Sequence, residues 1–143
     1  MSIFTDSSAL VKLYADEEDH ELVRLQSIFV ISQLARVEVP AALWRKQRMG
    51  ELTTVEAGLL VADFEDDYFG TEQKSSRFAI VAVTATVIEG AARLAGSHGL
   101  RAYDSVQLAS ACAMRATDPA CNTISAFDKA LRTSAIIEGF SLL

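Results

Sequence analysis

Short apolar runs alternate along the chain with longer segments whose apolar residues recur at helical spacing. The runs of strand length cover residues 3–5, 28–31, 78–83, 122–126 and 140–143. The segments of helical period cover residues 7–14, 18–25, 32–49, 53–64, 84–95, 103–114 and 128–137. Strands that alternate with helices form parallel sheets whose two faces are covered by the helices. The pattern therefore predicts an α/β fold, a three-layer α/β/α sandwich around a mainly parallel central sheet.

This order of elements also indicates where a ligand would bind. In open parallel sheets the ligand lies beyond the carboxyl ends of the strands, so residues directly after strands and in the first turns of helices are the candidates. One residue conflicts with the pattern. Pro40 falls inside a helical segment, and we expect it to bend or interrupt that helix.

Composition narrows the class of protein. The chain has 143 residues, half of them hydrophobic, which predicts one domain over residues 1–143. No apolar run approaches the ~20 residues of a membrane helix. The first six residues lack the basic and long apolar segments of a signal peptide. We therefore expect a cytoplasmic protein without a membrane contact.

The formal net charge of −6 argues against a protein that coats nucleic acid non-specifically. Nine acidic residues lie in two runs, at positions 16–21 and 63–67. Such runs are typical of solvated helix faces, and we assign them no catalytic role. Outside these runs the remaining charge is slightly basic.

Three aspartates outside these runs stand at the expected functional positions. Asp6 follows the first strand, Asp128 follows the fourth, and Asp104 stands at the head of a helix. Each of them is also a suitable helix cap, because a carboxylate accepts hydrogen bonds from free backbone N–H groups and complements the helix dipole. Taken singly, capping explains each aspartate as well as catalysis does.

Glu38 is harder to explain as a structural residue. Its helical neighbours at three and four residues are all apolar, namely Leu34, Ala35, Ala41 and Ala42. A carboxylate on such a face is buried or lines a cleft, and it needs a proton or a cation there. An ion pair with Arg45, on about the same helix face, is the structural alternative.

Together the four carboxylates predict a metal site. The two histidines and two cysteines are not spaced as metal ligands, so the site has oxygen donors only. Such a site suits Mg²⁺ or Mn²⁺ rather than Zn²⁺. A divalent ion relieves the repulsion between carboxylates, activates a water molecule and neutralises charge on a reacting phosphate. Phosphodiester hydrolysis is the natural use of this chemistry.

Four segments of the chain resemble the PIN-domain ribonucleases, in particular the VapC-type toxins of bacterial toxin–antitoxin pairs. They are IFTDSSALVK at residues 3–12, ARVEVPAAL at 35–43, LRAYDSVQLASA at 100–111 and SAFDKAL at 125–131. Their order, their spacing and the total length agree with that family, so the resemblance spans nearly the whole chain. The first and third segments are the most specific.

The resemblance implies a PIN fold and a Mg²⁺- or Mn²⁺-dependent endoribonuclease. It also implies a homodimer and a cognate antitoxin that occupies the active-site groove. The family's four acidic positions fall on Asp6, Glu38, Asp104 and Asp128. The chain departs from the family at Ala126, where many members have serine or threonine.

In the mechanism that this suggests, Asp6, Glu38 and Asp104 bind one metal ion, and Asp128 holds a second ion or orients the attacking water. Ser7 or Ser8 supports a ligand carboxylate by a hydrogen bond, or else both only begin the helix.

Basic residues near these acids are candidates for holding the RNA backbone, namely Lys12, Arg45, Lys46 and Arg48. For the cluster at 45–48, the alternative is ordinary positive charge at a helix C-terminus.

Three other functions remain open at this point. A haloacid-dehalogenase-like phosphatase also uses an aspartate after the first strand, but it needs a second one where this chain has Ser8. The acids of a non-catalytic interaction module would be caps and surface charge only. A PIN nuclease that processes RNA, without a toxin role, would have the same site.

Overall fold

The computed structural model describes residues 1–143 and contains five strands among eight helical segments. The strands are β1 (Ser2–Thr5), β2 (Ile28–Ser32), β3 (Phe78–Val81), β4 (Thr123–Ser125) and β5 (Ser141–Leu142). The helical segments are α1 (Ser7–Leu10), the 3-10 helix η1 (Val11–Leu13), α2 (His20–Arg24), α3 (Ala35–Arg48), α4 (Thr54–Phe69), α5 (Ala85–His98), α6 (Ala102–Thr117) and α7 (Lys129–Ile137).

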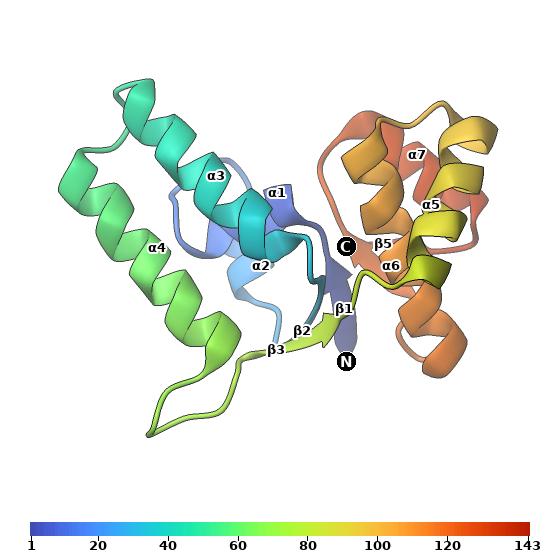
Figure 1. Cartoon of the computed structure of the whole chain (residues 1–143), viewed down its shortest axis with the longest axis horizontal. Coiled ribbons are helices and arrows are strands. Elements are labelled where there is room, and N and C mark those ends of the chain that lie inside the picture. The colour runs from blue at the N-terminus through green and yellow to red at the C-terminus, as the bar shows by residue number, and fades with distance from the viewer.

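The five strands form one sheet in the order β3-β2-β1-β4-β5, and every neighbouring pair is parallel. The sheet lies between two groups of helices, with α1 to α4 on one side and α5 to α7 on the other (Figure 1). The predicted three-layer α/β/α sandwich is therefore confirmed. Strand order reverses at β1, since β2 and β3 extend the sheet on one side and β4 and β5 on the other.

Alternate residues of β2 show why the sheet carries helices on both faces. Phe29 and Ile31 belong to a buried core with residues of α1, α3 and α4. Val30 points to the opposite face and joins a second core with Phe4, α6 and α7. Because successive side chains of a strand point to opposite faces, the uninterrupted apolar run predicted from the sequence supplies both cores at once.

Pro40 does not interrupt its helix, so of the two effects expected from the sequence, a bend or an interruption, the interruption is wrong. Helix α3 is continuous from Ala35 to Arg48 with Pro40 inside it. Proline removes only the N–H that would bond to the Arg36 carbonyl. The side chains of Val39 and Leu43 on this helix are fully buried, and their burial offsets the loss of one hydrogen bond.

The second acidic run is not wholly a solvated face, which corrects the sequence interpretation. Asp67 is buried, accepts a 2.7 Å hydrogen bond from the Tyr14 hydroxyl and pairs with Lys74 at 3.1 Å. Burial would raise the pKa of Asp67, but these two donors and the charge of Arg77 lower it on balance. Helix α4 ends at Phe69, five residues beyond the expected end.

The first acidic run also differs from the expectation, because it lies mostly in the connection before α2 and not on a helix. Its member Glu17 forms ion pairs with Lys12 and Lys46. No helix in the structure is both long enough and apolar enough to cross a membrane.

Candidate active site

One small pocket at the carboxyl ends of the central strands collects all four predicted carboxylates. Its volume is about 190 Å³, and no hydrophobic residue lines it. The eight lining residues are Asp6, Ser7, Ser8, Glu38, Arg101, Asp104, Gln107 and Asp128. The pocket lies where the strand order reverses, the position at which parallel sheets usually bind their ligands.

Asp6 lies at the centre of this arrangement and also caps α1, so capping and pocket lining coexist. One of its carboxylate oxygens accepts a 2.8 Å hydrogen bond from the Ala9 N–H. Burial, with smaller contributions from the charges of Asp104 and Glu38, raises the pKa of Asp6 from 3.8 to about 7 against the opposing hydrogen bonds from Ala9 and Ser8. The negative charge of this carboxylate therefore lacks a positive partner.

Asp104 and Asp128 approach the pocket from helices on the other face of the sheet (Figure 1). Asp104 lies in the first turn of α6, and Asp128 caps α7 by accepting a 3.0 Å hydrogen bond from the Leu131 N–H. Burial and the negative charge of Asp128 raise the pKa of Asp104, although Arg101 opposes this. Repulsion between carboxylates thus extends across the pocket.

Glu38 is held by neutral donors and does not pair with Arg45, so the structural alternative for this residue is wrong. Its Oε1 atom accepts hydrogen bonds of 2.8 Å from the Ser7 hydroxyl and from the Gln107 side-chain amide. Gln107 also donates to the Ser7 hydroxyl at 2.8 Å. These contacts fix one oxygen of Glu38 and leave its charge uncompensated.

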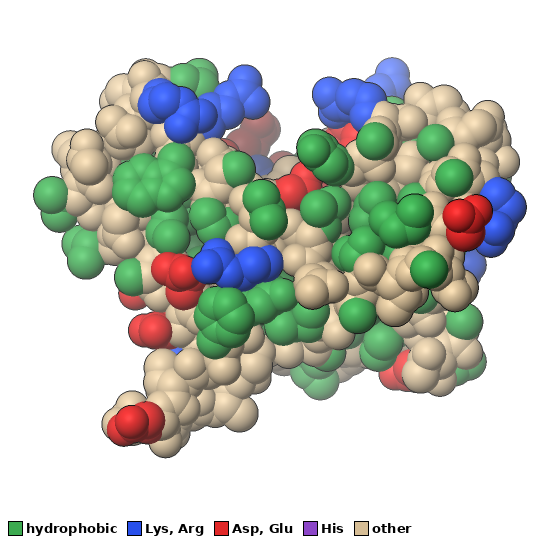
Figure 2. Space-filling model, viewed as in Figure 1, with side chains coloured by type: hydrophobic (Ala, Val, Ile, Leu, Met, Phe, Trp, Pro, Cys, Tyr) green, Lys and Arg blue, Asp and Glu red, His purple; other side chains and the backbone are tan.

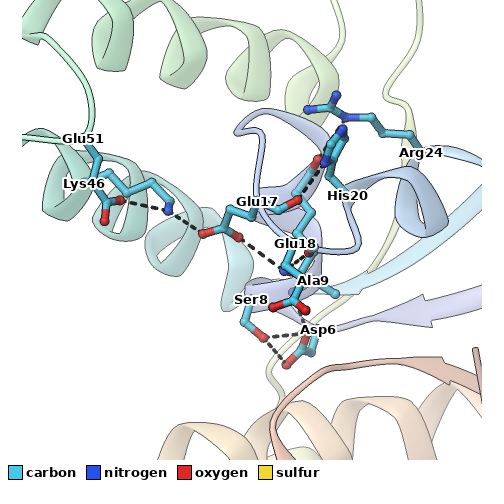
Figure 3. A network of polar contacts seen from close by, with 10 residues as sticks. Asp6, Ser8, Ala9, Glu17, Glu18, His20, Arg24, Lys46 and Glu51 are labelled. Atoms are coloured by element: carbon cyan, nitrogen blue, oxygen red, sulfur yellow. Dashed lines mark hydrogen bonds and ion pairs between the residues drawn. The ribbon is translucent and has the colours of Figure 1, made fainter.

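Both serines contact carboxylates and do more than begin a helix. The Ser7 hydroxyl donates to Glu38, whereas the Ser8 hydroxyl lies 2.9 and 3.1 Å from the two oxygens of Asp6. Figure 3 shows Ser8 directed at Asp6 from the start of α1. The two serines therefore orient two different acids.

The sequence reasoning missed Arg101 and Gln107. Both lie three residues from Asp104, one on each side, and residues at this spacing share a helix face. This spacing in the sequence could have identified both residues as neighbours of Asp104. The amide of Gln107 carries no charge of its own, however, and only the fold places it beside Glu38, 69 residues away.

We expect Gln107→Leu to lower the activity of the protein by about 10- to 100-fold, because outer contacts that orient a ligand carboxylate carry effects of this size. Gln73→Leu, at an exposed loop position, is the matched control and should leave activity unchanged. The measurement is the rate of the catalysed reaction for each variant, with circular dichroism to show that both variants are folded. An active, folded Gln107→Leu protein would show that Glu38 needs no such support.

The pocket fits a divalent cation by its donor chemistry. It offers four carboxylates, with no histidine or cysteine, and burial and mutual repulsion raise the pKa values of two of them. No three such side chains are close enough to hold one ion directly. Mg²⁺ commonly keeps several waters and binds through one or two carboxylates, so the spread of these acids is compatible with such an ion.

Of the four basic candidates, two are engaged elsewhere. The Lys46 amino group lies between Glu17 and Glu51, as Figure 3 shows. Lys12 pairs with Glu17 and donates a 2.7 Å hydrogen bond to the Glu18 carbonyl. The prediction that these two lysines hold phosphate is therefore not supported, because structural partners already pair with their charges.

Arg45 and Arg48 are exposed and have no ion-pair partner. They line a larger open groove of about 880 Å³ that also contains Glu38 and Tyr103. Figure 2 shows a hollow at the top of the view, with acidic side chains on its floor and lysine or arginine side chains on both rims. A polyanion in this groove would meet positive charge before it reaches the acids.

The parallel sheet, with an acidic pocket where its strand order reverses, indicates the class of this protein. A family model of the PIN domain matches residues 3–136, and the chain belongs to the PIN-domain family. The resemblance recognised in the sequence is thereby confirmed.

Two relatives narrow the comparison to VapC proteins. Ribonuclease VapC45 and Ribonuclease VapC49, each from a strain of Mycobacterium tuberculosis, are both 35% identical to this chain over 141 residues. Each alignment covers 96% of this chain and 91% of the relative.

Two solved structures share the fold at low identity. M. tuberculosis VapC20, described as a sarcin-ricin loop cleaving toxin, has a TM-score of 0.64 at 20% identity, covering 96% of this chain and 95% of that one. FitAcB from Neisseria gonorrhoeae has a TM-score of 0.63 at 15% identity, covering 99% and 96%.

Proposed function

We propose that this protein, as a single PIN domain, is a Mg²⁺- or Mn²⁺-dependent endoribonuclease. The observation that carries the proposal is the convergence of Asp6, Glu38, Asp104 and Asp128 on one pocket without apolar lining. The relatives named as ribonucleases support RNA as the substrate. The phosphatase alternative is not retained, because the chain belongs to the PIN family and has Ser8 where that chemistry needs a second aspartate.

The four carboxylates have different roles in this proposal. Asp6, Glu38 and Asp104 would hold the cation, in part through water, and Asp128 would orient the attacking water or help hold a second ion. When bound, the ion activates that water and neutralises charge on the reacting phosphate. Ser8 and Ser7 keep the oxygens of Asp6 and Glu38 directed into the pocket.

The direct test is cleavage of a defined RNA panel by the purified protein with Mg²⁺, with Mn²⁺ and with a chelator. We expect cleavage with either metal and none with the chelator, with 5′-phosphates on the new ends. Undiminished cleavage under chelation would contradict metal dependence. Lack of cleavage of every RNA tested, with saturable Mn²⁺ binding present, would count against RNA as the substrate.

Arg45 and Arg48 are proposed to hold the RNA backbone in the groove beside the acids. We expect the double variant Arg45→Gln, Arg48→Gln to raise KM and leave kcat nearly unchanged, because the contacts are equal in the ground and transition states. The slope of log KM against the logarithm of salt concentration should also fall by about 1.4, because two phosphate contacts are lost. Arg93→Gln, on the exposed surface of α5, is the matched control. A normal salt slope in the double variant would remove these arginines from the RNA path.

A role as the toxin of a toxin–antitoxin pair is the finer part of the proposal. A cognate antitoxin would occupy the groove, and the active form would be a cytoplasmic homodimer. Inducing the wild type should stop growth, whereas Asp6→Asn should not. Equal growth of both strains, together with RNA cleavage by the purified wild type, would identify an RNA-processing nuclease in place of a toxin.

A further inference from the structure

Arg101 holds two of the pocket's acids from its rim. Its Nη2 atom lies 3.4 Å from Asp104 Oδ2 and 3.9 Å from Asp128 Oδ1. The same guanidinium nitrogen therefore lies between two carboxylates of like charge. The guanidinium is the one cationic group among the residues that line this pocket, so it is the internal counter-charge of the metal-free site.

The backbone of Arg101 is held by hydrogen bonds, whereas its side chain is largely exposed. The Arg101 carbonyl accepts hydrogen bonds from both the N–H and the hydroxyl of Ser105, at 2.9 and 3.0 Å. By contrast, 83% of the side chain is exposed. Exposed ion pairs at such distances are weak and screened by salt, so the guanidinium can leave the two acids at small cost while its attachment point stays in place.

A divalent ion bound at these carboxylates would weaken the interaction of Arg101 with Asp104 and Asp128. Once the acids are neutralised, the attraction that holds the guanidinium is lost, and the ion itself repels it. A planar guanidinium presents paired N–H donors that fit a phosphate group. From the rim of the pocket, the guanidinium would then meet a neighbouring phosphate of an RNA strand whose scissile phosphate has entered the pocket.

We propose that Arg101 exchanges partners during the reaction: it bridges Asp104 and Asp128 in the metal-free protein and holds the RNA phosphate next to the cleavage site once the cation is bound. This inference rests on the proposed ribonuclease function. Arg101 is accordingly a substrate-binding residue that also competes with the metal ion, and its replacement should affect the two ligands in opposite directions.

The test compares wild type with Arg101→Gln, Arg101→Lys and the control Arg93→Gln in two assays. Calorimetric titration with Mn²⁺, without RNA, should show about 3-fold tighter binding by Arg101→Gln, because the exposed pair no longer competes. RNA cleavage at saturating Mn²⁺ should show a KM about 10-fold higher for this variant, because a charged hydrogen bond to phosphate is lost. Arg93→Gln should match the wild type in both.

Arg101→Lys separates a specific contact from a general effect of charge. An ammonium can approach only one acid at a time and cannot hold phosphate with paired donors, so this variant should fall between the wild type and Arg101→Gln in both assays. If Arg101→Lys equals the wild type in both, charge alone suffices and the bridging role is wrong.

The two proposals fail in different ways. Equal Mn²⁺ affinity of wild type and Arg101→Gln, or weaker binding by the variant, overturns the exchange and leaves the metal-dependent nuclease intact. An unchanged KM also overturns it, since Arg101 then does not hold the substrate. Absence of Mn²⁺ binding by the wild type overturns the metal site itself, and the inference about Arg101 with it.

Discussion

Asp6→Asn is expected to reduce RNA cleavage by a factor on the order of 10³, because the site loses a central carboxylate and several kcal/mol of metal-dependent stabilisation of the transition state. Asparagine has the same shape and is as good a helix cap as aspartate. It keeps the Oδ1 atom, which can accept the hydrogen bonds from both Ala9 and Ser8. The substitution therefore removes the charge and leaves the start of α1 in place.

The measurement is the single-turnover cleavage rate of a defined RNA at saturating Mn²⁺. Asp16→Asn is the matched control, because Asp16 is an exposed aspartate that pairs only with Arg24 and lies outside the pocket. It should retain full activity. Cleavage by folded Asp6→Asn protein within a few-fold of the wild-type rate would exclude Asp6 from the catalytic site.

The stability of the metal-free protein is expected to fall as the pH rises from about 4 to about 7. Burial raises the pKa of Asp6 from 3.8 to about 7, so the folded state retains a proton that the unfolded state has lost. An acid whose pKa is raised by folding destabilises the folded state above its unfolded pKa. Full ionisation of Asp6 corresponds to a destabilisation on the order of 4 kcal/mol, and the loss should level off above pH 7.

Denaturant unfolding of wild type and Asp6→Asn between pH 4 and 8 measures this effect. The difference between the two proteins isolates Asp6 from groups such as Asp67, whose lowered pKa has the opposite influence. The variant should be the more stable protein at pH 8, and the two should converge near pH 4. Parallel pH profiles would show that Asp6 ionises without cost in the folded state.

Mn²⁺ should recover part of this stability in the wild type, because an ion that binds only the folded state stabilises it by about 2.7 kcal/mol at 100 times its Kd. The recovery should be largest at pH 8, where Asp6 is ionised. Asp6→Asn should respond much less. An equal response of both proteins would place the ion away from Asp6.

Several elements were predictable because their signals are local. The run at 28–31 is apolar throughout and became β2, the strand that feeds both cores. Asp6 and Asp128 follow strands in the sequence, and the parallel arrangement brings strand ends to one edge of the sheet. The apolar neighbours of Glu38 likewise indicated a carboxylate that does not face open solvent.

Other features depend on partners that are distant in the sequence. From the sequence, the acidic run containing Asp67 was predicted to be a solvated helix face. In the structure, the hydroxyl of Tyr14, 53 residues away, donates a hydrogen bond to Asp67. Lys12 and Lys46 looked available for phosphate, yet both converge on Glu17. Each of these assignments required knowing which charges lie within a few ångströms, where Coulomb interactions are strong.

The sequence by itself predicted the α/β architecture, the family and the four candidate acids, because periodicity and local motifs depend on residues close together in the chain. Tertiary structure alone decided that Gln107 and Ser7 hold Glu38, that Arg101 spans Asp104 and Asp128, and that Asp6 is buried, which raises its pKa. The physical reason is that hydrogen bonds, ion pairs and desolvation act over short distances in space, whatever the separation of the residues along the chain.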